Sequence, residues 1–321
     1  MDKVWLKSYP ADVPHDIHPE QYSSLSALLE ESFKKHAASP FTVCMNCWMT
    51  YQQLDQLSAA FGAWLQSKGF APGARIAIML PNIPQFPVAM CGILRAGFTC
   101  VNVNPLYTPR ELAHQLKDSG ATAIVILENF ASTLAEVIET TDIKQVVIAS
   151  MGDLLGFWYG RWLTFAVRHL AKMVPSYSLP LSGERVVTPF SRAISDAAQL
   201  SLKPNTSSLD SIAFLQYTGG TTGLSKGAVL SHRNIVSAVL QAGVSAFLCV
   251  RRLRVYPRRC ALVGNARPFK AARALSTVAR AWVGKPGFIV RSAPWQSAPR
   301  TGWQTGSSPP SSAAQPAPSR P

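Results

Sequence analysis

The chain has 321 residues, 47% of them hydrophobic, which suffices for one large core or two modest domains and excludes a wholly disordered polypeptide. The formal net charge of +14 is unevenly placed, because residues 1–242 carry 18 Lys and Arg with all 17 acids, whereas residues 243–321 carry 13 Lys and Arg with no acid. The basicity therefore belongs to the end of the chain and indicates no anionic partner for the larger part.

The start of the chain and its apolar runs bear on where the protein resides. No secretory signal is visible, and no run of 18 apolar residues is free of Pro or charge, so no spanning helix is predicted. Several of the six cysteines lie within apolar segments, as buried free thiols do. We therefore expect a cytoplasmic protein in a reducing compartment.

The first elements predicted along the chain are an arm, a helix, a hairpin and a second helix. Residues 1–23 are polar and contain three prolines, which favours an extended arm. Apolar residues at helical spacing follow over 25–33, and residues 41–49 predict a hairpin. Residues 50–53 form a capping-box pattern, and residues 54–65 continue one apolar helical face from it.

Strand and helix patterns then alternate over residues 75–149. Thr108 and Glu111 form a second capping box, with Pro109 in the first helical turn and Gly120 at the end of that helix. Such alternation predicts an α/β fold with a largely parallel sheet covered on both faces. Strands are predicted at 75–80, 98–104, 121–127 and 143–149, and helices at about 84–95, 108–119 and 129–139.

Residues 154–174 combine aromatic and basic side chains and allow two interpretations. Aromatic rings with basic neighbours suit the headgroup region of a bilayer, so this segment can be a peripheral contact with the inner face of the membrane. Alternatively, the aromatics form an apolar helical stripe that packs into the protein core. The residues concerned are Trp158, Tyr159, Trp162 and Phe165, with Arg161, Arg168 and Lys172.

The last organised part of the chain follows a polar stretch, residues 179–210, which predicts a loop. A strand is predicted at 212–217, then a loop rich in Gly and Thr, a short strand at 227–230 and a helix from about residue 231.

Beyond Gln241 the composition changes abruptly. Ala, Arg, Pro, Ser and Gly supply 49 of the residues 243–321, whereas about six acids would be expected there and none occurs. These amino acids have GC-rich codons, so we interpret 242–321 as a low-complexity Arg/Pro/Ala/Ser-rich tail read out of frame. A genuine disordered basic tail is the alternative. The domain boundary is accordingly placed between residues 1–241 and 242–321.

The segment 217–228 is the most informative in the chain. Three glycines within five positions let backbone N–H groups approach a ligand and form an anion-binding nest. Hydroxyl groups and one lysine complete a cradle for a polyphosphate, although the order of residues is not that of a Walker A loop. The predicted binding residues are Thr218, Gly219, Gly220, Thr221, Thr222, Gly223, Ser225 and Lys226.

This loop resembles the phosphate-binding signature of the adenylate-forming superfamily, and the following Ser231-His-Arg-Asn234 fits the same block. Segments at 4–10, 78–82, 101–112, 127–130 and 173–180 look like those of bacterial long-chain fatty-acid–CoA ligases. The resemblance covers residues 1–241 almost without a break. It implies incomplete amino-terminal subdomains of the adenylate-forming (AMP-binding) fold, with residues 242–321 as a disordered basic tail.

The resemblance also implies an activity. The intact family uses ATP and Mg²⁺ to convert a long-chain fatty acid to acyl-adenylate and pyrophosphate, and then transfers the acyl group to CoA. Its adenine-stacking segment, magnesium-binding Glu, ribose-binding Asp and lid Lys are not found between Gly243 and Pro321. We therefore assign no catalytic residue and no metal ligand, and expect a truncated ligase that is inactive or nearly so.

A second function class remains open on charge patterning. Five arginines in 251–259 could make the tail a non-enzymatic binder of nucleic acid or acidic lipid. Aromatic residues are sparse there and no nucleic-acid fold signature is present, so nucleic acid is not the expected partner.

Two further candidates have ordinary structural explanations. Cys44 and Cys47 have the C-x-x-C spacing of some metal and redox sites, but no second pair accompanies them and they fall in a predicted hairpin turn. His232 has no obvious proton to move, and we interpret it as a structural or phosphate-proximal residue.

Overall fold

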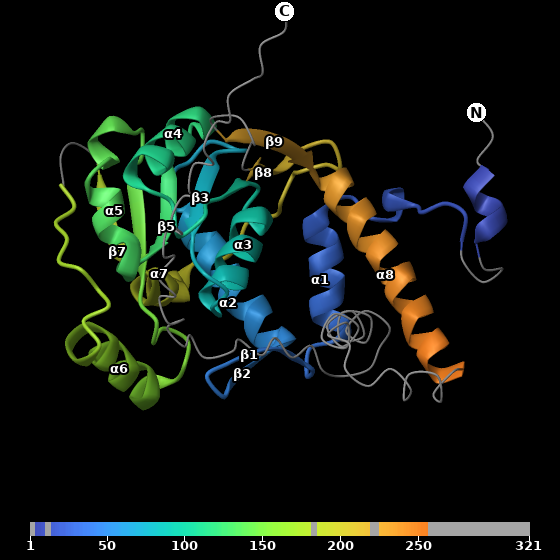
Figure 1. Ribbon diagram of the computed structural model, residues 1–321, viewed down its shortest axis with the longest axis horizontal. Coiled ribbons are helices and arrows are strands. Elements are labelled where there is room, and N and C mark those ends of the chain that lie inside the picture. The colour runs from blue at the N-terminus through green and yellow to red at the C-terminus, as the bar shows by residue number, and fades with distance from the viewer. Residues whose placement is uncertain (1–3, 10–13, 181–184, 219–224, 256–321) are drawn as a thin grey trace, which may run out of the picture.

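A computed structural model describes residues 4–9, 14–180, 185–218 and 225–255, without the side chains of Trp5 and 244–255 (Figure 1). Its centre is a seven-stranded sheet in the order β7-β6-β5-β3-β4-β8-β9, parallel throughout except for β9. The predicted α/β class with a largely parallel sheet is confirmed. The strands are β3 (Arg75–Met79), β4 (Thr99–Asn102), β5 (Ala123–Leu127), β6 (Gln145–Ala149), β7 (Val186–Pro189), β8 (Ile212–Thr218) and β9 (Lys226–Ser231).

Both faces of the sheet are covered, because its central strands are short apolar runs that bury their side chains in both directions. On one face pack α1 (Leu25–Lys35), α2 (Tyr51–Gln66), α3 (Gln85–Arg95), α7 (Phe190–Asp196) and the start of α8 (His232–Val255). On the other face pack α4 (Pro109–Ser119) and α5 (Ala131–Ala135).

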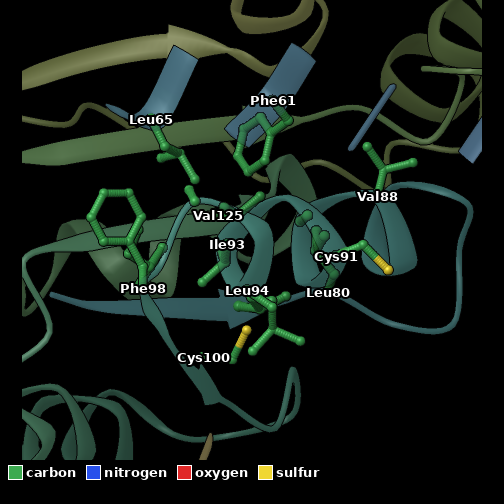
Figure 2. Packing of buried hydrophobic residues seen from close by; sticks show 14 of the residues in the cluster. Phe61, Leu65, Leu80, Val88, Cys91, Ile93, Leu94, Phe98, Cys100 and Val125 are labelled. Atoms are coloured by element: carbon green, nitrogen blue, oxygen red, sulfur yellow. The ribbon is translucent and has the colours of Figure 1, made fainter. Parts of the chain in front are cut away.

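Helices α2 and α3 approach one another through glycine. A Cβ atom on Gly92 would meet the Ser58 carbonyl oxygen at 3.0 Å and the Phe61 ring at 2.9 Å, and one on Gly62 would meet the Gly92 oxygen at 2.9 Å. The helices therefore touch backbone to backbone where α3 lies over the sheet. Figure 2 shows Phe61 of α2 beside the apolar side chains of α3 in this cluster.

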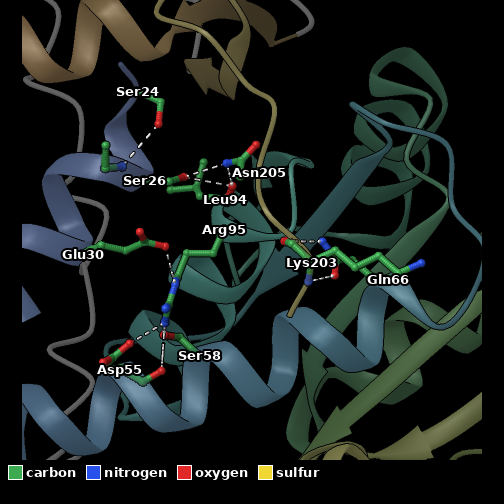
Figure 3. A network of polar contacts seen from close by, with 11 residues as sticks. Ser24, Ser26, Glu30, Asp55, Ser58, Gln66, Leu94, Arg95, Lys203 and Asn205 are labelled. Carbon is green, nitrogen blue, oxygen red and sulfur yellow. Dashed lines mark hydrogen bonds and ion pairs between the residues drawn. The ribbon is translucent and has the colours of Figure 1, made fainter. Parts of the chain in front are cut away.

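One turn after Gly92, a buried arginine joins three helices (Figure 3). Arg95 is only 8% exposed. Its Nη1 donates to the Asp55 carbonyl oxygen at 2.8 Å and to Ser58 Oγ at 2.9 Å, both on α2. Its Nε reaches Glu30 Oε1 of α1 at 3.4 Å. A buried charge of this kind is tolerated because its donors are engaged.

The predicted helix starts are confirmed by their caps. Thr50 and Gln53 form a complete capping box at α2, and Thr108 and Glu111 form one at α4. Hydrogen bonds from Thr108 lower the pKa of the exposed Glu111 carboxyl. Gly120 closes α4 in the left-handed conformation, with φ of 60°.

The predicted hairpin comprises β1 (Pro40–Cys44) and β2 (Cys47–Thr50), joined by Met45 and Asn46 at φ of 47° and 67°. Cys44 and Cys47 lie opposite each other in register across this turn and are not joined by a disulfide. Within the described residues no cluster of three metal-ligating side chains occurs. The C-x-x-C spacing is thus explained by a tight turn.

Two predictions of secondary structure were wrong. The helix expected at 129–139 is broken into η3 (Glu128–Phe130), α5 and η4 (Ile138–Thr140). The stretch 179–210, expected to be a loop, contains β7, α7 and η6 (Ala197–Gln199). Phe190 in this stretch is fully buried. The stretch was missed because a four-residue edge strand containing Pro189 gives too little local pattern to be recognised from the sequence.

The arm and the aromatic segment also differ from expectation. The arm contains two short 3-10 helices, η1 (Val4–Ser8) and η2 (Pro19–Gln21). The aromatic segment forms α6 (Phe157–Phe165), continued by the π-helical turn η5 (Ala166–Leu170). Its aromatics are exposed, with Trp158 at 82% and Trp162 at 60%, so they do not pack into the core of the described chain.

In the described part of the chain, no helix combines the length and the apolar character needed to cross a bilayer. Helix α8 continues through residues 242–255, so the first part of the predicted disordered tail, 242–321, is helical. Residues 256–321 lie outside the described residues, and the expectations for them stay predictions.

Candidate functional site

The predicted phosphate-binding loop follows the carboxyl end of β8, which pairs with β4 in parallel. Ligands of open α/β sheets bind beyond the carboxyl ends of the parallel strands, so this is the expected place for a site. Strand β9 returns antiparallel to β8, with Thr218 opposite Lys226 and Tyr217 opposite Gly227. The two strands therefore hold the two ends of the loop side by side.

Three of the predicted binding residues are described. Thr218 and Lys226 are exposed at the facing ends of the two strands, and Ser225 is half-buried beside them. Among the described residues Lys226 forms no ion pair, so its ammonium group is free to meet an anion. The others, Gly219, Gly220, Thr221, Thr222 and Gly223, lie outside the described residues.

The glycine after Lys226 is required by a neighbouring ring. A Cβ atom on Gly227 would meet Cζ of Tyr217 at 2.9 Å, because the ring lies across the opposite strand. Tyr217 is itself buried, whereas Lys226 and Thr218 point to solvent. Gly227 thus lets the Tyr217 ring cross the hairpin at the base of the loop.

Helix α4 contacts both ends of the loop. Tyr217, at the entry, donates its hydroxyl proton to Asp118 Oδ2 at 2.5 Å. Burial, together with that carboxylate, raises the pKa of Tyr217 well above its usual range, so the ring stays a neutral donor. At the exit, His114 Nε2 lies 3.2 Å from the Ser225 carbonyl oxygen and donates to it in the matching tautomer.

Sequence reasoning missed this contact with α4. His114 and Asp118 are separated by four positions and therefore share one face of the helix. Each lies about a hundred positions from its partner on the loop, and nothing in the local pattern links them.

The block that follows the loop is structural. Ser231 and Asn234 exchange side-chain and backbone hydrogen bonds at the start of α8. His232 is 1% exposed, and its Nδ1 accepts the N–H of Leu25, the first residue of α1, at 3.1 Å. Burial lowers the pKa of His232, and the ring acts as a neutral acceptor. Arg233 pairs with Asp210 and Glu20, both at 3.0 Å.

The contacts of His232 bear on its two interpretations, a structural residue and a phosphate-proximal residue. The Nδ1 nitrogen of His232 already accepts the backbone N–H of Leu25 at the start of α1. Its burial and its helix contact support the structural interpretation.

The described residues fit a polyphosphate better than a divalent cation. A free ammonium group and hydroxyl donors at the ends of a loop suit phosphate oxygens. Asp118 is the acid that reaches this loop in the hydrogen bonds described, and it is engaged by Tyr217. No group of three His, Cys, Asp or Glu side chains gathers within the described ranges.

The model of the AMP-binding enzyme family matches residues 29–256 of the chain. A long-chain-fatty-acid–CoA ligase from Yersinia pestis is 47% identical over 244 residues, 75% of this chain and 42% of the relative. A ligase of the same name from Escherichia coli O157:H7 is 47% identical over 247 residues, 76% of this chain and 43% of the relative. The chain therefore spans less than half the length of these relatives.

The fold is also similar to that of solved structures. A long-chain-fatty-acid-CoA ligase from Archaeoglobus fulgidus matches with a TM-score of 0.55 at 20% identity, over 74% of this chain and 42% of the other. The apo structure of Mycobacterium smegmatis MbtA matches with a TM-score of 0.56 at 20% identity, over 88% and 45%. At this identity the likeness concerns the fold alone.

The buried ring of His232 makes stability depend on pH. Because its folded-state pKa lies below the usual 6.5, the stabilisation is complete above that pH and is lost as the pH falls below it. We expect urea unfolding of the full chain to give a smaller free energy of unfolding at acidic pH. His232→Asn, which can still accept the Leu25 N–H, should flatten this dependence. His18→Asn, at an exposed position, should not; equal pH profiles for wild type and His232→Asn would contradict the assignment.

The contact with α4 should fix the conformation of the loop. Removing both side chains, as His114→Ala with Asp118→Ala, takes away two hydrogen bonds worth about 1–3 kcal/mol together, so the two ends of the loop should separate about 5- to 150-fold more often. Hydrogen exchange of the amides from 218 to 226 would measure this, with β5 as the internal reference. Lys117→Ala, an exposed residue of the same helix, is the matched control. Unchanged exchange in the double variant would show that the strands alone hold the loop.

Proposed function

The chain belongs to the AMP-binding enzyme family, and on that premise we propose that residues 1–241 are the amino-terminal part of an ATP-dependent long-chain fatty-acid–CoA ligase. The observation that carries the proposal is the β8–β9 hairpin, which brings Thr218 and Lys226 together at the carboxyl edge of the sheet. Relatives with this name at 47% identity support the choice of substrate class.

The roles proposed for the residues follow from their chemistry. Lys226 would neutralise charge on the phosphates of ATP through charge-assisted hydrogen bonds. Thr218 and Ser225, with the loop residues 219–223, would donate hydroxyl and backbone hydrogen bonds to the same oxygens. Tyr217, Gly227, His114 and Asp118 would hold the loop in position without touching the nucleotide.

The ligands proposed for the ligase are ATP with Mg²⁺, a long-chain fatty acid and CoA. Mg²⁺, when bound, supplies further charge neutralisation at the phosphates. The acidic, adenine-binding and lid motifs of the resembled enzymes are not found in 243–321. The chain as it stands is therefore proposed to bind the nucleotide without completing the reaction.

We also propose that residues 242–321 are encoded out of frame. The absence of acids and the excess of Ala, Arg, Pro, Ser and Gly after Gln241 support this. A peripheral position at the inner face of the membrane is proposed from the exposure of the aromatics at 154–174. Nothing in the described fold favours nucleic acid as a partner.

The proposal is tested by reading the gene beyond codon 241 in the other two frames and expressing the repaired chain. We expect ATP–pyrophosphate exchange that depends on a long-chain fatty acid. Lys226→Ala should lower its rate about tenfold or more, because a charge-assisted hydrogen bond contributes about 1.5–3 kcal/mol. Lys34→Ala, an exposed lysine on α1, is the matched control. Absence of fatty-acid-dependent exchange in the repaired chain would reject the ligase assignment, and an unaffected Lys226→Ala variant would reject the role of this lysine.

A further inference from the structure

Helix α6 presents its large aromatic side chains to solvent and its small residues to the protein. Phe157 is 67% exposed, Trp158 82%, Trp162 60% and Phe165 54%. The one buried residue of the helix is Gly160. This is the reverse of the usual amphipathic pattern, in which the apolar stripe faces the core.

The reversal is fixed by a backbone contact. A Cβ atom on Gly160 would meet the Gly152 carbonyl oxygen at 2.2 Å, and one on Gly152 would meet the Gly160 oxygen at 1.9 Å. The helix is thus seated directly on the segment that leaves β6, with no room for side chains between them. Turning the helix to bury its tryptophans would break this contact, so the outward orientation is a property of the fold.

The β1–β2 hairpin extends the same side of the molecule. Cys47 Sγ lies 3.4 Å from the carbonyl oxygen of Leu155, which joins the hairpin turn to the residues just before α6. Trp48 is 53% exposed and Met45 41%. In Figure 1 the hairpin and α6 both lie along the lower edge of the molecule, so two segments about a hundred residues apart expose apolar side chains together. We call these six side chains the aromatic surface: Met45, Trp48, Phe157, Trp158, Trp162 and Phe165.

The charges beside the aromatic surface are mostly positive, with Asp153 as an acid that lines the same pocket as Phe157, Arg161 and Phe165. No acid occurs between residues 154 and 174. The Arg161 guanidinium lies 5.4 Å from the centre of the Phe157 ring, in cation–π contact, and Lys172 is exposed in the segment that follows η5. Arg168 does not add to this charge, because the buried carboxylate of Glu128 holds it at 2.6 Å.

We propose that the aromatic surface docks on the headgroup region of a bilayer that contains anionic phospholipid. Trp rings are partly wet at their polar edge and partly apolar, which matches the interface. Arg161 and Lys172 meet lipid phosphate, and each cation near an anionic surface contributes about 1 kcal/mol. This proposal rests on the proposed function in one respect: a ligase for long-chain acids has a reason to contact membranes, because such acids partition into them. The exposed rings and the charges support the membrane contact independently.

The test uses the full chain and vesicles of three parts phosphatidylcholine to one part phosphatidylglycerol, in a sedimentation assay without ATP or CoA. The basic tail would bind such vesicles by charge alone, so binding is measured in about 1 M salt, where the Debye length is about 3 Å. Insertion of aromatic rings survives this screening, whereas attraction of the 13 tail cations does not. Both tryptophans are exposed, so substituting them should leave the fold intact.

We expect Trp158→Ser with Trp162→Ser to weaken binding in high salt about tenfold, equivalent to about 1.4 kcal/mol. Leu106→Ser, at an apolar residue 72% exposed and distant in the chain from the aromatic surface, is the matched control.

Equal binding of the wild type and the tryptophan variant in high salt would overturn the proposal. So would light scattering that shows a dimer dissociated by the same two substitutions, because the surface would then be an interface between two copies of the chain. Neither outcome depends on ligase activity. If the repaired chain shows no fatty-acid-dependent ATP–pyrophosphate exchange, the ligase assignment is rejected. If vesicle binding still requires both tryptophans, the membrane contact stands on its own.

Discussion

The close contact of α2 with α3 is the constraint on which the rest of the structure depends. Because Gly62 and Gly92 carry no side chain, the two helices touch through their backbones above the sheet. This places Arg95, one turn further on, within reach of both α2 and α1. The first residue of α1 is in turn bonded to His232 at the start of α8. Through this series of contacts the packing of two helices is linked to the start of α8, which directly follows β9.

The candidate site is built by long-range pairing around a short motif. The hairpin register sets Thr218 against Lys226, and α4 supplies the two side chains that reach the base of the loop. Hydrogen-bonding donors that are positioned before the ligand arrives lose little entropy on binding, which is the physical advantage of holding Thr218 and Ser225 in place at the two ends of the loop. The site's geometry is thus a property of α4 and the sheet as much as of the Gly/Thr motif.

Much of the fold could be predicted because its signals are local. The capping boxes at Thr50 and Thr108 each place a cap and its partner three residues apart. The buried strands can be recognised as continuous apolar runs in the sequence. The strand β7 and helix α7 were missed because their place is decided by pairing with β6 and by burial of Phe190, not by periodicity. For the site, the loop was recognised from its residue types. The hydrogen bond from Tyr217 to Asp118 could not be recognised, because the two residues are 99 positions apart in the sequence. The tail beyond residue 255 stays a prediction.

The segment after β8 and the segment after β6 are alike in their place relative to the sheet. Both are connections that leave the carboxyl ends of strands in one parallel sheet, β8 and β6, where a scaffold leaves room for function. In each, a glycine makes room for a neighbouring group: the Tyr217 ring packs against Gly227 in the strand pair that exposes Lys226, and Gly160 packs against Gly152 in the helix that exposes the tryptophans. A Cβ atom at Gly227 or at Gly160 would require the neighbouring atoms to shift. At α6 the contact joins two backbones and sets which face of the helix is turned outward. We therefore treat Lys226 and the aromatic rings as sites for ligands rather than as unburied remnants of the core.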